Sequence, residues 1–464
     1  MRERIGMSQM TALNGAAGVS RRRGIRPMLP AFLRERGDSF SLVILFLLVF
    51  IIPNQIALNF GGVHLPPLRI ALLLLLIPII MAMLRRQGGK LYDFDKWYIA
   101  FVLWTCLCIM INRGASGVEP AGQFALEYLF VYMMAQGCLT SVSRLRAVLS
   151  LTVLLVLGLL MLAMPEAINR QHYAQNFANA LVGRPPIVAD PEYVRMGMQR
   201  AMTVFTHPII YGVFCATLFG LVWQIETSPL KRVVSTTILM VAAFFSLSSA
   251  PILVLFVQIF LMTIERATRW LKNRFKIFMS ILLTLIVLLE TFTGRGFVGT
   301  LMIFTLNPAT AYYRKLIWEN GIDDVLRNPV FGMRPEEWTR LFWMTFSIDN
   351  EWLLQMMRGG IPSLIFLTVA LLLLIRRLYA RPDHAIPDVL ARMRRGWLFM
   401  MIALILCGAT VSFFDKMQSF FALMIGLGGV IARLMIDWEK TEAAASRTVA
   451  RHGETPPPQR RTVL

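Results

Sequence analysis

The stretch VAAFFSLSSAPILVL, residues 241–255, decides the topology of the fold, because it can be read as one long apolar run or as the junction of two. Small residues and a proline at Ser248–Pro251 favour a tight turn or a broken helix at this point. A single run would place the basic stretch RATRWLKNRFK, residues 266–276, on the opposite side of the membrane from the other basic links. The sequence therefore predicts two membrane spans that meet near Ser248.

The composition around this stretch is that of a membrane protein. The chain has 464 residues, of which 56% are hydrophobic and only 16% are charged, whereas about a quarter of the residues of a soluble protein are charged. The apolar blocks are about 17–25 residues long, which suits helices that cross a hydrocarbon core of about 30 Å; barrel strands would be shorter and alternating. We predict an all-α polytopic membrane protein with about 12 transmembrane helices. The predicted spans are residues 40–60, 66–84, 97–112, 121–138, 146–164, 202–224, 232–247, 249–264, 275–292, 351–375, 396–412 and 417–436.

The net charge of +20 is distributed over the links between the apolar blocks. Most of the 47 Lys and Arg residues lie on one side of the membrane when the N-terminus is cytoplasmic, as the positive-inside rule requires. This pattern predicts that both termini are cytoplasmic, and it argues against nucleic acid as a partner. The five cysteines all lie in apolar runs, which argues against disulfides.

These spans and links divide the chain into five parts. They are a basic cytoplasmic N-terminus at 1–38, nine spans in 39–292 with an outer loop at 165–201, a large helical outer loop at 293–350, three more spans in 351–437, and a disordered cytoplasmic tail at 438–464.

The large outer loop contains the stretch ATAYYRKLIWENGIDDVLRNPVFG, residues 309–332, which mixes aromatic and charged residues between apolar segments. The pair Asn307-Pro308 predicts a helix start, and the helix is expected to run from about 308 to 326. Its i, i+4 spacing places Arg314, Trp318 and Ile322 on one face. RPEEW, residues 334–338, predicts a second helix with acidic residues in its first turn. We therefore expect a two-helix lid on the membrane surface.

Three motifs in this region resemble the O-antigen ligase/polymerase superfamily. They are RAMTVFTHPIIYG (200–212), RKLIWENGIDDVLRNPVFGM (314–333) and SIDNEWLLQMMRGGIP (347–362), and the resemblance covers about 195–365. It implies a metal-independent glycosyltransferase of the GT-C-like helical membrane type, without a cofactor, in the bacterial inner membrane. The implied substrate is an undecaprenyl-pyrophosphate-linked glycan at the periplasmic face. The implied partners are membrane lipids and, in an assembly complex, chain-length regulator and flippase proteins.

The resemblance favours the polymerase branch of this superfamily, for O-antigen or exopolysaccharide. Ligases typically carry a His-Asn pair where this chain has Asp349-Asn350. A Ser-Arg-Gly pattern common in the family reads SSAP at 248–251, so no role is assigned to that turn. The alternatives are a ligase that transfers glycan to lipid A-core and, in other classes, a lipid-linked glycan flippase or a scaffold. A transporter commonly shows two related halves, and no internal repeat is apparent here.

Two arginines are the first candidate site residues. Arg200 and Arg314 are expected to bind pyrophosphate as catalytic residues, because a guanidinium offers planar, bidentate donors to phosphate oxygens. The alternative is interfacial snorkelling or a loop salt bridge. Asp349 is the candidate catalytic carboxylate that orients or deprotonates a sugar hydroxyl. It could instead cap the helix that begins near residue 350.

The remaining candidates are expected to bind substrate. Glu351 is the rival carboxylate to Asp349, and Asn350 lies between them. His207 precedes Pro208, and a hydrogen-bonded helix start is the preferred reading for it. Tyr313 and Trp318 could stack on sugars or anchor the loop at the interface. GRGFVG, residues 294–299, matches a dinucleotide fingerprint but follows a membrane span, so the match is attributed to chance. No metal site is expected, because no zinc-ligand spacing occurs among the His and Cys residues.

Overall fold

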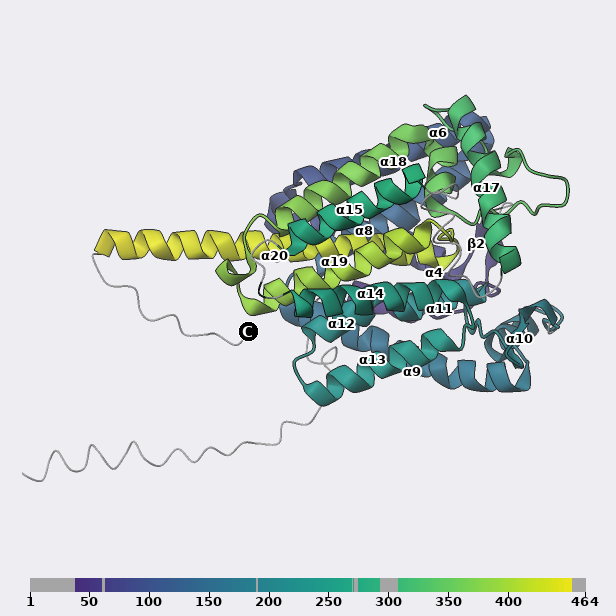
Figure 1. Cartoon of the computed structure of the whole chain (residues 1–464), viewed down its shortest axis with the longest axis horizontal. Helices are drawn as coiled ribbons and strands as arrows, with labels where there is room; N and C mark the ends of the chain where they lie inside the picture. Colours follow the sequence, from purple (N-terminus) through teal and green to yellow (C-terminus); the bar gives the residue numbers. More distant parts are fainter. Residues whose placement is uncertain are drawn as a thin grey trace, which may run out of the picture.

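The computed structural model of the chain describes residues 38–60, 63–188, 191–268, 270, 274–292 and 308–452. In these residues the protein is an elongated bundle of helices with two small antiparallel hairpins (Figure 1). The GRGFVG motif and the helix-start pair Asn307-Pro308 lie outside or at the border of the described residues. The class predicted from the sequence, an all-α polytopic membrane protein, agrees with this architecture.

The first half of the chain supplies ten helical elements of the bundle. They are α3 (Asp38–Phe50), α4 (Pro67–Leu74), α5 (Leu76–Arg85), α6 (Asp93–Arg113), α7 (Val118–Phe124), the π-helical turn η3 (Ala125–Phe130), α8 (Val131–Cys138), α9 (Val142–Asn169), α11 (Pro208–Thr217) and α12 (Phe219–Ile225). Between α9 and α11 lie α10 (Tyr173–Leu181), β3 (Val194–Arg195) and β4 (Met198–Gln199); β1 (Leu58–Phe60) pairs with β2 (Val63–Leu65).

The second half continues with α13 (Pro229–Phe244), α14 (Ser249–Ala267), α15 (Arg274–Phe292), α17 (Pro308–Arg327), α18 (Glu351–Leu378), α19 (Asp388–Gly408) and α20 (Lys416–His452). Short 3-10 turns lie at Arg86–Gly89, Gly114–Gly117, Pro191–Tyr193, Pro335–Glu337 and Asp383–Ala385. Each of the predicted span ranges therefore holds a helix. By length and composition, six helical stretches of the described chain are suited to cross a membrane, or seven if the bent pair α4–α5 counts as one.

The longest of these stretches, Asp93–Cys138, folds back on itself. The rings of Tyr98 and Tyr132 stack at 4.2 Å between centroids, and Phe101 lies 5.8 Å from Tyr128. Such contacts require α6 and α8 to run antiparallel. The reversal occurs at Gly117, where a Cβ atom would lie 2.8 Å from the carbonyl oxygen of Ile109. The sequence predicted two spans here, and the hairpin agrees with that reading.

The junction at residues 241–255 is a sharp turn, as predicted. Helix α13 ends at Phe244 and α14 begins at Ser249. Leu247 adopts a left-handed backbone conformation with φ of 44°, which residues other than glycine rarely adopt outside turns. Both helices pack against α11. The turn also bonds to the segment that precedes α11, because the Phe245 carbonyl oxygen accepts from the Ala201 N–H at 2.9 Å.

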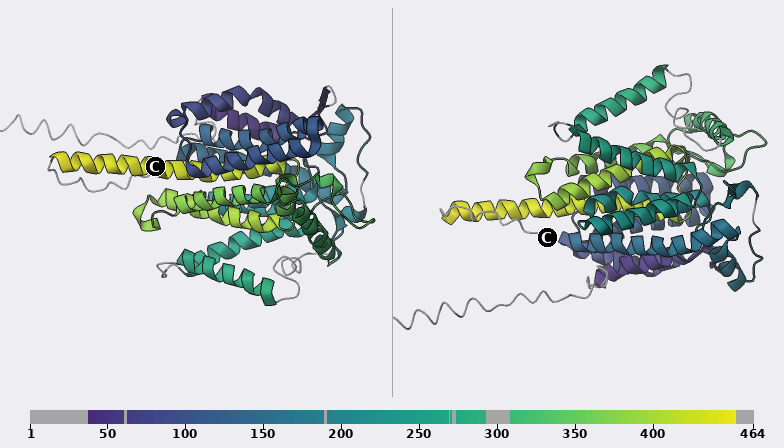
Figure 2. Two further views of the ribbon diagram at one scale, coloured as in Figure 1. Left: turned by 90° about the horizontal axis from the view of Figure 1, so that it is seen from above. Right: turned by 60° about the horizontal axis from the view of Figure 1, so that its bottom comes forward.

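Helix α20 forms the centre of the bundle, and its apolar part is almost entirely buried. Arg433 of α20 is fully buried and forms an ion pair of 2.7 Å with the buried Asp95 of α6. The helix continues to His452, beyond residue 438, from which the sequence analysis expected a disordered tail. Good helix formers and pairs such as Arg377–Glu439, at 2.6 Å, explain the extension. Figure 2 shows the end of α20 projecting from the bundle.

Helix α17 spans Pro308–Arg327, close to the predicted range, and it crosses one end of the bundle beside α18 (Figure 1). The second helix of the predicted lid is absent among the described residues. Only the 3-10 turn Pro335–Glu337 forms there, because Trp338 turns into extended backbone and buries its ring in the small apolar cluster beneath α17. Helix α10 lies at the same end of the bundle (Figure 1), so the described parts of both long loops gather there.

Candidate functional site

Three arginines from separate segments line one small cavity at the α17 end. Arg195 belongs to β3, Arg200 follows β4, and Arg314 lies on α17. The wall is completed by Ile209 and by the turn before α14. The cavity volume is about 20 Å³, room for about one water molecule. The sequence predicted Arg200 and Arg314, and the structure brings both to one place. It also adds Arg195, which the sequence analysis did not select.

The turn between α13 and α14 holds two of these arginines. Arg200 donates from Nη2 to Ser248 Oγ at 2.7 Å and from Nε to the Ser246 carbonyl oxygen at 3.4 Å. Arg195 donates from Nη1 to the Leu247 carbonyl oxygen at 3.1 Å. Ser248 belongs to the SSAP turn to which the sequence analysis gave no role. Serines and a proline inside an apolar run were the available signal for this turn.

The backbone that carries Arg200 is fixed from its other side by α9. Glu166 is fully buried, and its carboxylate accepts hydrogen bonds from the backbone N–H groups of Met202 at 3.2 Å and Thr203 at 3.0 Å. The guanidinium of Arg200 also lies over the ring of Tyr193, with 5.5 Å between Cζ and the ring centroid. Arg200 is therefore held in a preformed position and does not reach freely into solvent.

Arg314 is the least satisfied of the three arginines. Its side chain is only 5% exposed, and its Nε has no hydrogen-bond partner among the described residues. Burial lowers the pKa of the Arg314 guanidinium, and Arg195 lowers it too, whereas the carboxylate of Asp349 raises it. A buried cation with a vacant N–H donor favours an anionic ligand, because an unsatisfied buried donor costs about 1–3 kcal/mol.

Asp349 and Asn350 take different positions at the start of α18. Asn350 is the helix cap: its Oδ1 accepts from the Leu353 N–H at 3.0 Å, and its Nδ2 donates to the Ala409 carbonyl oxygen at 3.0 Å. Both ends of the Asn350 amide are therefore used within the protein. Asp349 is half-buried and accepts from Ser347 Oγ at 2.8 Å. The cap reading considered for Asp349 is wrong, and its charge is left to act on Arg314.

Glu351 is directed into the bundle, away from the arginine cavity. The side chain is fully buried and accepts hydrogen bonds from Tyr128 Oη at 3.1 Å, Gln355 Nε2 at 2.7 Å and the Phe413 N–H at 2.6 Å. These bonds tie α18 to the helical hairpin and to the segment before α20. The geometry thus gives Glu351 a positioning role in the bundle and does not place it among the residues that line the arginine cavity.

His207 caps α11, which is the reading preferred from the sequence. Its Nδ1 accepts from the Ile209 N–H at 3.2 Å, so the neutral ring carries its hydrogen on Nε2. Burial, together with the positive charges of Arg200, Arg195 and Arg314, lowers the pKa of His207 to about 4. The imidazole is therefore neutral at physiological pH and adds no charge to the three arginines.

Tyr313 and Trp318 support α17 and do not line the cavity. Tyr313 Oη lies 2.8 Å from Thr345 Oγ1 and accepts from the Thr345 N–H at 2.8 Å. Trp318 is half-buried and packs against the small apolar cluster between α17 and α18. Both side chains fix the helix that carries Arg314 to the chain segment that follows it.

Backbone hydrogen bonds join the motif at residues 314–333 to the motif at residues 347–362. Helix α18 breaks at Gly359–Gly360, which have non-helical dihedral angles. The break diverts two groups that would otherwise bond to each other within the helix: the Met357 carbonyl oxygen accepts from Met333 N–H at 2.6 Å, and the Ile361 N–H donates to the Pro329 carbonyl oxygen at 2.8 Å. The end of α17 is thereby fastened to α18.

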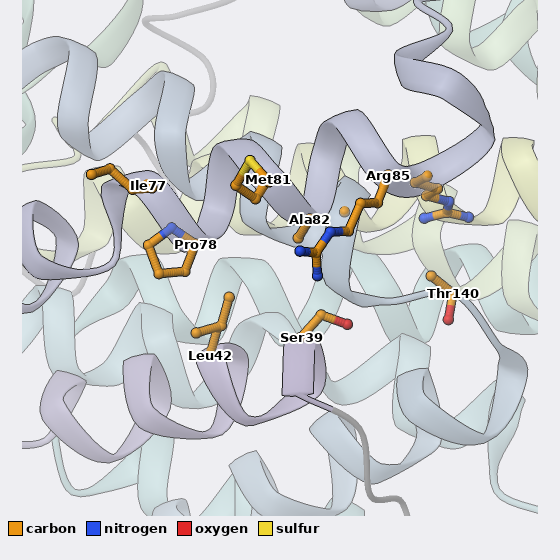
Figure 3. A pocket seen from close by; sticks show the side chains of 10 residues that line it. Ser39, Leu42, Ile77, Pro78, Met81, Ala82, Arg85 and Thr140 are labelled. Carbon is orange, nitrogen blue, oxygen red and sulfur yellow. The ribbon is translucent and has the colours of Figure 1, made fainter.

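Another cavity lies between α3, α5 and the end of α8. It measures about 600 Å³. Figure 3 shows its mainly apolar lining, with Ile77, Pro78 and Met81 on one wall and Arg85 at one end. It shares no lining residue with the arginine cavity. Among the described residues, no three His, Cys, Asp or Glu side chains form a group that could hold a metal ion.

Comparison with known protein families and with curated proteins gives no match for this chain. The functional argument therefore rests on the arginine cavity and its surroundings.

Proposed function

We propose that the protein is a polymerase of polyprenyl-pyrophosphate-linked oligosaccharide repeat units, for O-antigen or exopolysaccharide, acting at the periplasmic face of the bacterial inner membrane. The observation that carries the proposal is the convergence of Arg195, Arg200 and Arg314, with no carboxylate lining the same cavity. Three guanidinium groups suit a pyrophosphate, because each offers paired donors that match phosphate oxygens. The resemblance of the surrounding motifs to the O-antigen ligase/polymerase superfamily supports the same substrate class.

The proposed reaction is a direct glycosyl transfer. A sugar hydroxyl of one lipid-linked glycan attacks the anomeric carbon of another, the new glycosidic bond forms, and the bond to polyprenyl pyrophosphate breaks. The hydroxyl proton passes to Asp349 as general base. The electron pair leaves with the pyrophosphate, whose growing charge is stabilised by the three arginines, as preorganised donors do in a site of low dielectric. Pyrophosphate is already an activated leaving group, so ATP is not required.

Substrate entry requires movement of α17. The cavity of about 20 Å³ is too small for a pyrophosphate group. Of the three cavity arginines, Arg314 lies on α17, whereas Arg195 and Arg200 are held by the turn before α14. Outward movement of α17 would open the cavity, and its return would bring Arg314 and the nearby Asp349 onto the bound substrate. In this proposal α17 is a lid, and the helices make twelve crossings with both termini cytoplasmic.

The proposal is tested by repeat-unit polymerisation with purified full-length protein in lipid vesicles and isolated lipid-linked repeat units. We expect Arg314→Ala to abolish polymer and Arg314→Lys to restore it only partly, because lysine keeps the charge and loses the planar fork. Arg327→Ala is the matched control on the same helix, with a side chain that is 62% exposed. Full polymerisation by Arg314→Ala would contradict the proposal.

Analysis of the surface glycan in a deletion strain separates the alternatives. Loss of a polymerase leaves single repeat units on the surface. Loss of a ligase leaves long chains on the lipid carrier, and loss of a flippase leaves single units on the cytoplasmic side. Either of the last two results would replace the polymerase by the corresponding alternative.

A further inference from the structure

A second cavity lies at the same end of the bundle and has a different chemical character. Its volume is about 320 Å³, and its polar lining comes from α4, the end of α6, α7, η3, the 3-10 turn Pro335–Glu337, α18 and the chain around the start of α20. The polar side chains that matter for the argument are Arg69, Gln123, Glu127, Arg358, Asp415 and Gln418. Neither the resembling motifs nor the proposed reaction gives these residues a role.

The charges around this cavity balance. Arg69 donates from Nε to Glu127 at 2.7 Å, and Arg113 pairs with Glu336 at 2.6 Å at the rim. Arg358 and Asp415 add one charge of each sign to the lining. The Nη1 of Arg358 is buried and has no hydrogen-bond partner among the described residues. A polar lining whose charges balance suits a neutral, hydroxyl-rich ligand, whereas the arginine cavity suits an anion.

Residues 206–207, which precede α11, and residues 414–415, which precede α20, contact each other between the two cavities. Asp415 accepts from the Thr206 N–H at 3.3 Å and from Thr206 Oγ1 at 3.1 Å. The rings of His207 and Phe414 lie 5.9 Å apart. The ring of His207 also lies 5.9 Å from that of Tyr193, over which Arg200 is placed, and Phe414 lines the second cavity. A ligand in the second cavity therefore lies beside the site at which the pyrophosphate is expected to leave.

We propose that the second cavity binds the acceptor glycan, an inference that rests on the proposed function. The amide and carboxylate groups bind sugar hydroxyls, and Arg358 fills its unused donor on one of them. Phe124 and Phe414 present apolar faces to the sugar rings. The hydroxyl-rich sugar part of the lipid-linked acceptor occupies this cavity, and its reacting hydroxyl extends past the Thr206–Asp415 contact toward the arginine cavity. The pyrophosphate of the donor thus lies in a positively charged site, and the sugars of the acceptor lie in a separate site whose charges balance.

The test uses purified full-length protein in nanodiscs and two probes, measured separately by calorimetry. One probe is inorganic pyrophosphate, and the other is the repeat-unit oligosaccharide released by mild acid from the host's lipid-linked intermediate. We expect Gln123→Trp to fill the second cavity, weaken oligosaccharide binding at least tenfold and leave pyrophosphate binding unchanged. Val118→Trp is the matched control, because Val118 is on the same helix and is 60% exposed.

The outcomes separate this inference from the proposed function. Arg314→Ala is expected to show the reverse pattern, with loss of pyrophosphate binding and retained oligosaccharide binding. Wild-type protein that does not bind the oligosaccharide, or a Gln123→Trp variant that binds it normally, would overturn the acceptor site. Wild-type protein that does not bind pyrophosphate would count against the proposed function instead. Unchanged pyrophosphate binding by Gln123→Trp shows that the variant is folded.

Discussion

Asp349 and Asn350 are adjacent in the sequence, but the structure gives them separate roles. Asn350 uses its whole side chain to cap α18 and to reach the Ala409 carbonyl oxygen. Asp349 stays half-buried, with one hydrogen bond from Ser347 and an electrostatic effect on Arg314. Because the cap is supplied by Asn350, the carboxylate of Asp349 is not needed to begin the helix.

This division predicts the effect of Asp349→Asn. The change keeps size and polarity and removes the charge, so we expect normal membrane abundance and a normal melting temperature. As the general base of the proposed reaction, Asp349 should contribute about 10²–10⁴-fold to the rate. Polymer formation in vesicles measures this loss.

Asp323→Asn is the matched control, because it makes the same atomic change at an exposed position of α17. A second variant, Asp349→His, restores the ligase-like pair ahead of Asn350, and partial activity would support a shared geometry. Normal polymerisation by Asp349→Asn would remove the carboxylate from the reaction and leave the arginines without an identified base.

At the scale of elements, the fastening of α17 to α18 depends on Gly360. Its φ is 67°, and a Cβ atom there would clash with the Val330 carbonyl oxygen. We expect Gly360→Ala to detach the end of α17, because it adds backbone strain and breaks the contact between the Pro329–Gly332 segment and the broken helix. The expected signs are a lower melting temperature and faster proteolysis between α17 and α18.

The control for this prediction is Gly158→Ala in α9. A Cβ atom at Gly158 meets no other atom within 4 Å, and alanine in a helix interior is favoured over glycine by about 1 kcal/mol. The control should therefore be as stable as the wild type or slightly more so. Equal proteolysis of Gly360→Ala and wild type would show that the break in α18 does not hold α17.

The elements also show what the sequence could predict. Local signals were sufficient for the end of α17, and they placed the break between α13 and α14 to within a few residues. Arg200 and Arg314 were selected by chemistry and motif resemblance. Arg195 was missed, because only the pairing of β3 with β4 and the contact with Leu247 bring it to the cavity. The predicted second helix of the lid does not form, because burial of Trp338 outweighs the local helix-start pattern.

At the scale of the whole molecule, the two ends of the bundle differ in composition. One end carries α10, α17 and both polar cavities, and the other carries the links between α12 and α13 and between α18 and α19, together with the end of α20 (Figure 1). Some of the basic residues predicted to be cytoplasmic, such as Lys231, Arg232 and Arg381, lie in or beside these links. The described parts of the predicted outer loops therefore gather at one end, and the positive-inside rule predicts that this end faces the periplasm in the proposed polymerase.

Reporter fusions test this assignment. Fusions after Gln87, Thr227 and Pro382 should give a cytoplasmic signal, and fusions near Val182 and Glu336 should give a periplasmic one, because the first three positions lie in or beside basic links. Val182 follows α10, and Glu336 follows α17. An alkaline phosphatase and a green fluorescent protein fusion at each position give opposite readouts and control for expression. A cytoplasmic signal at Glu336 would place α17 on the side opposite the lipid-linked donor, and α17 could then not act as the lid of the proposed polymerase.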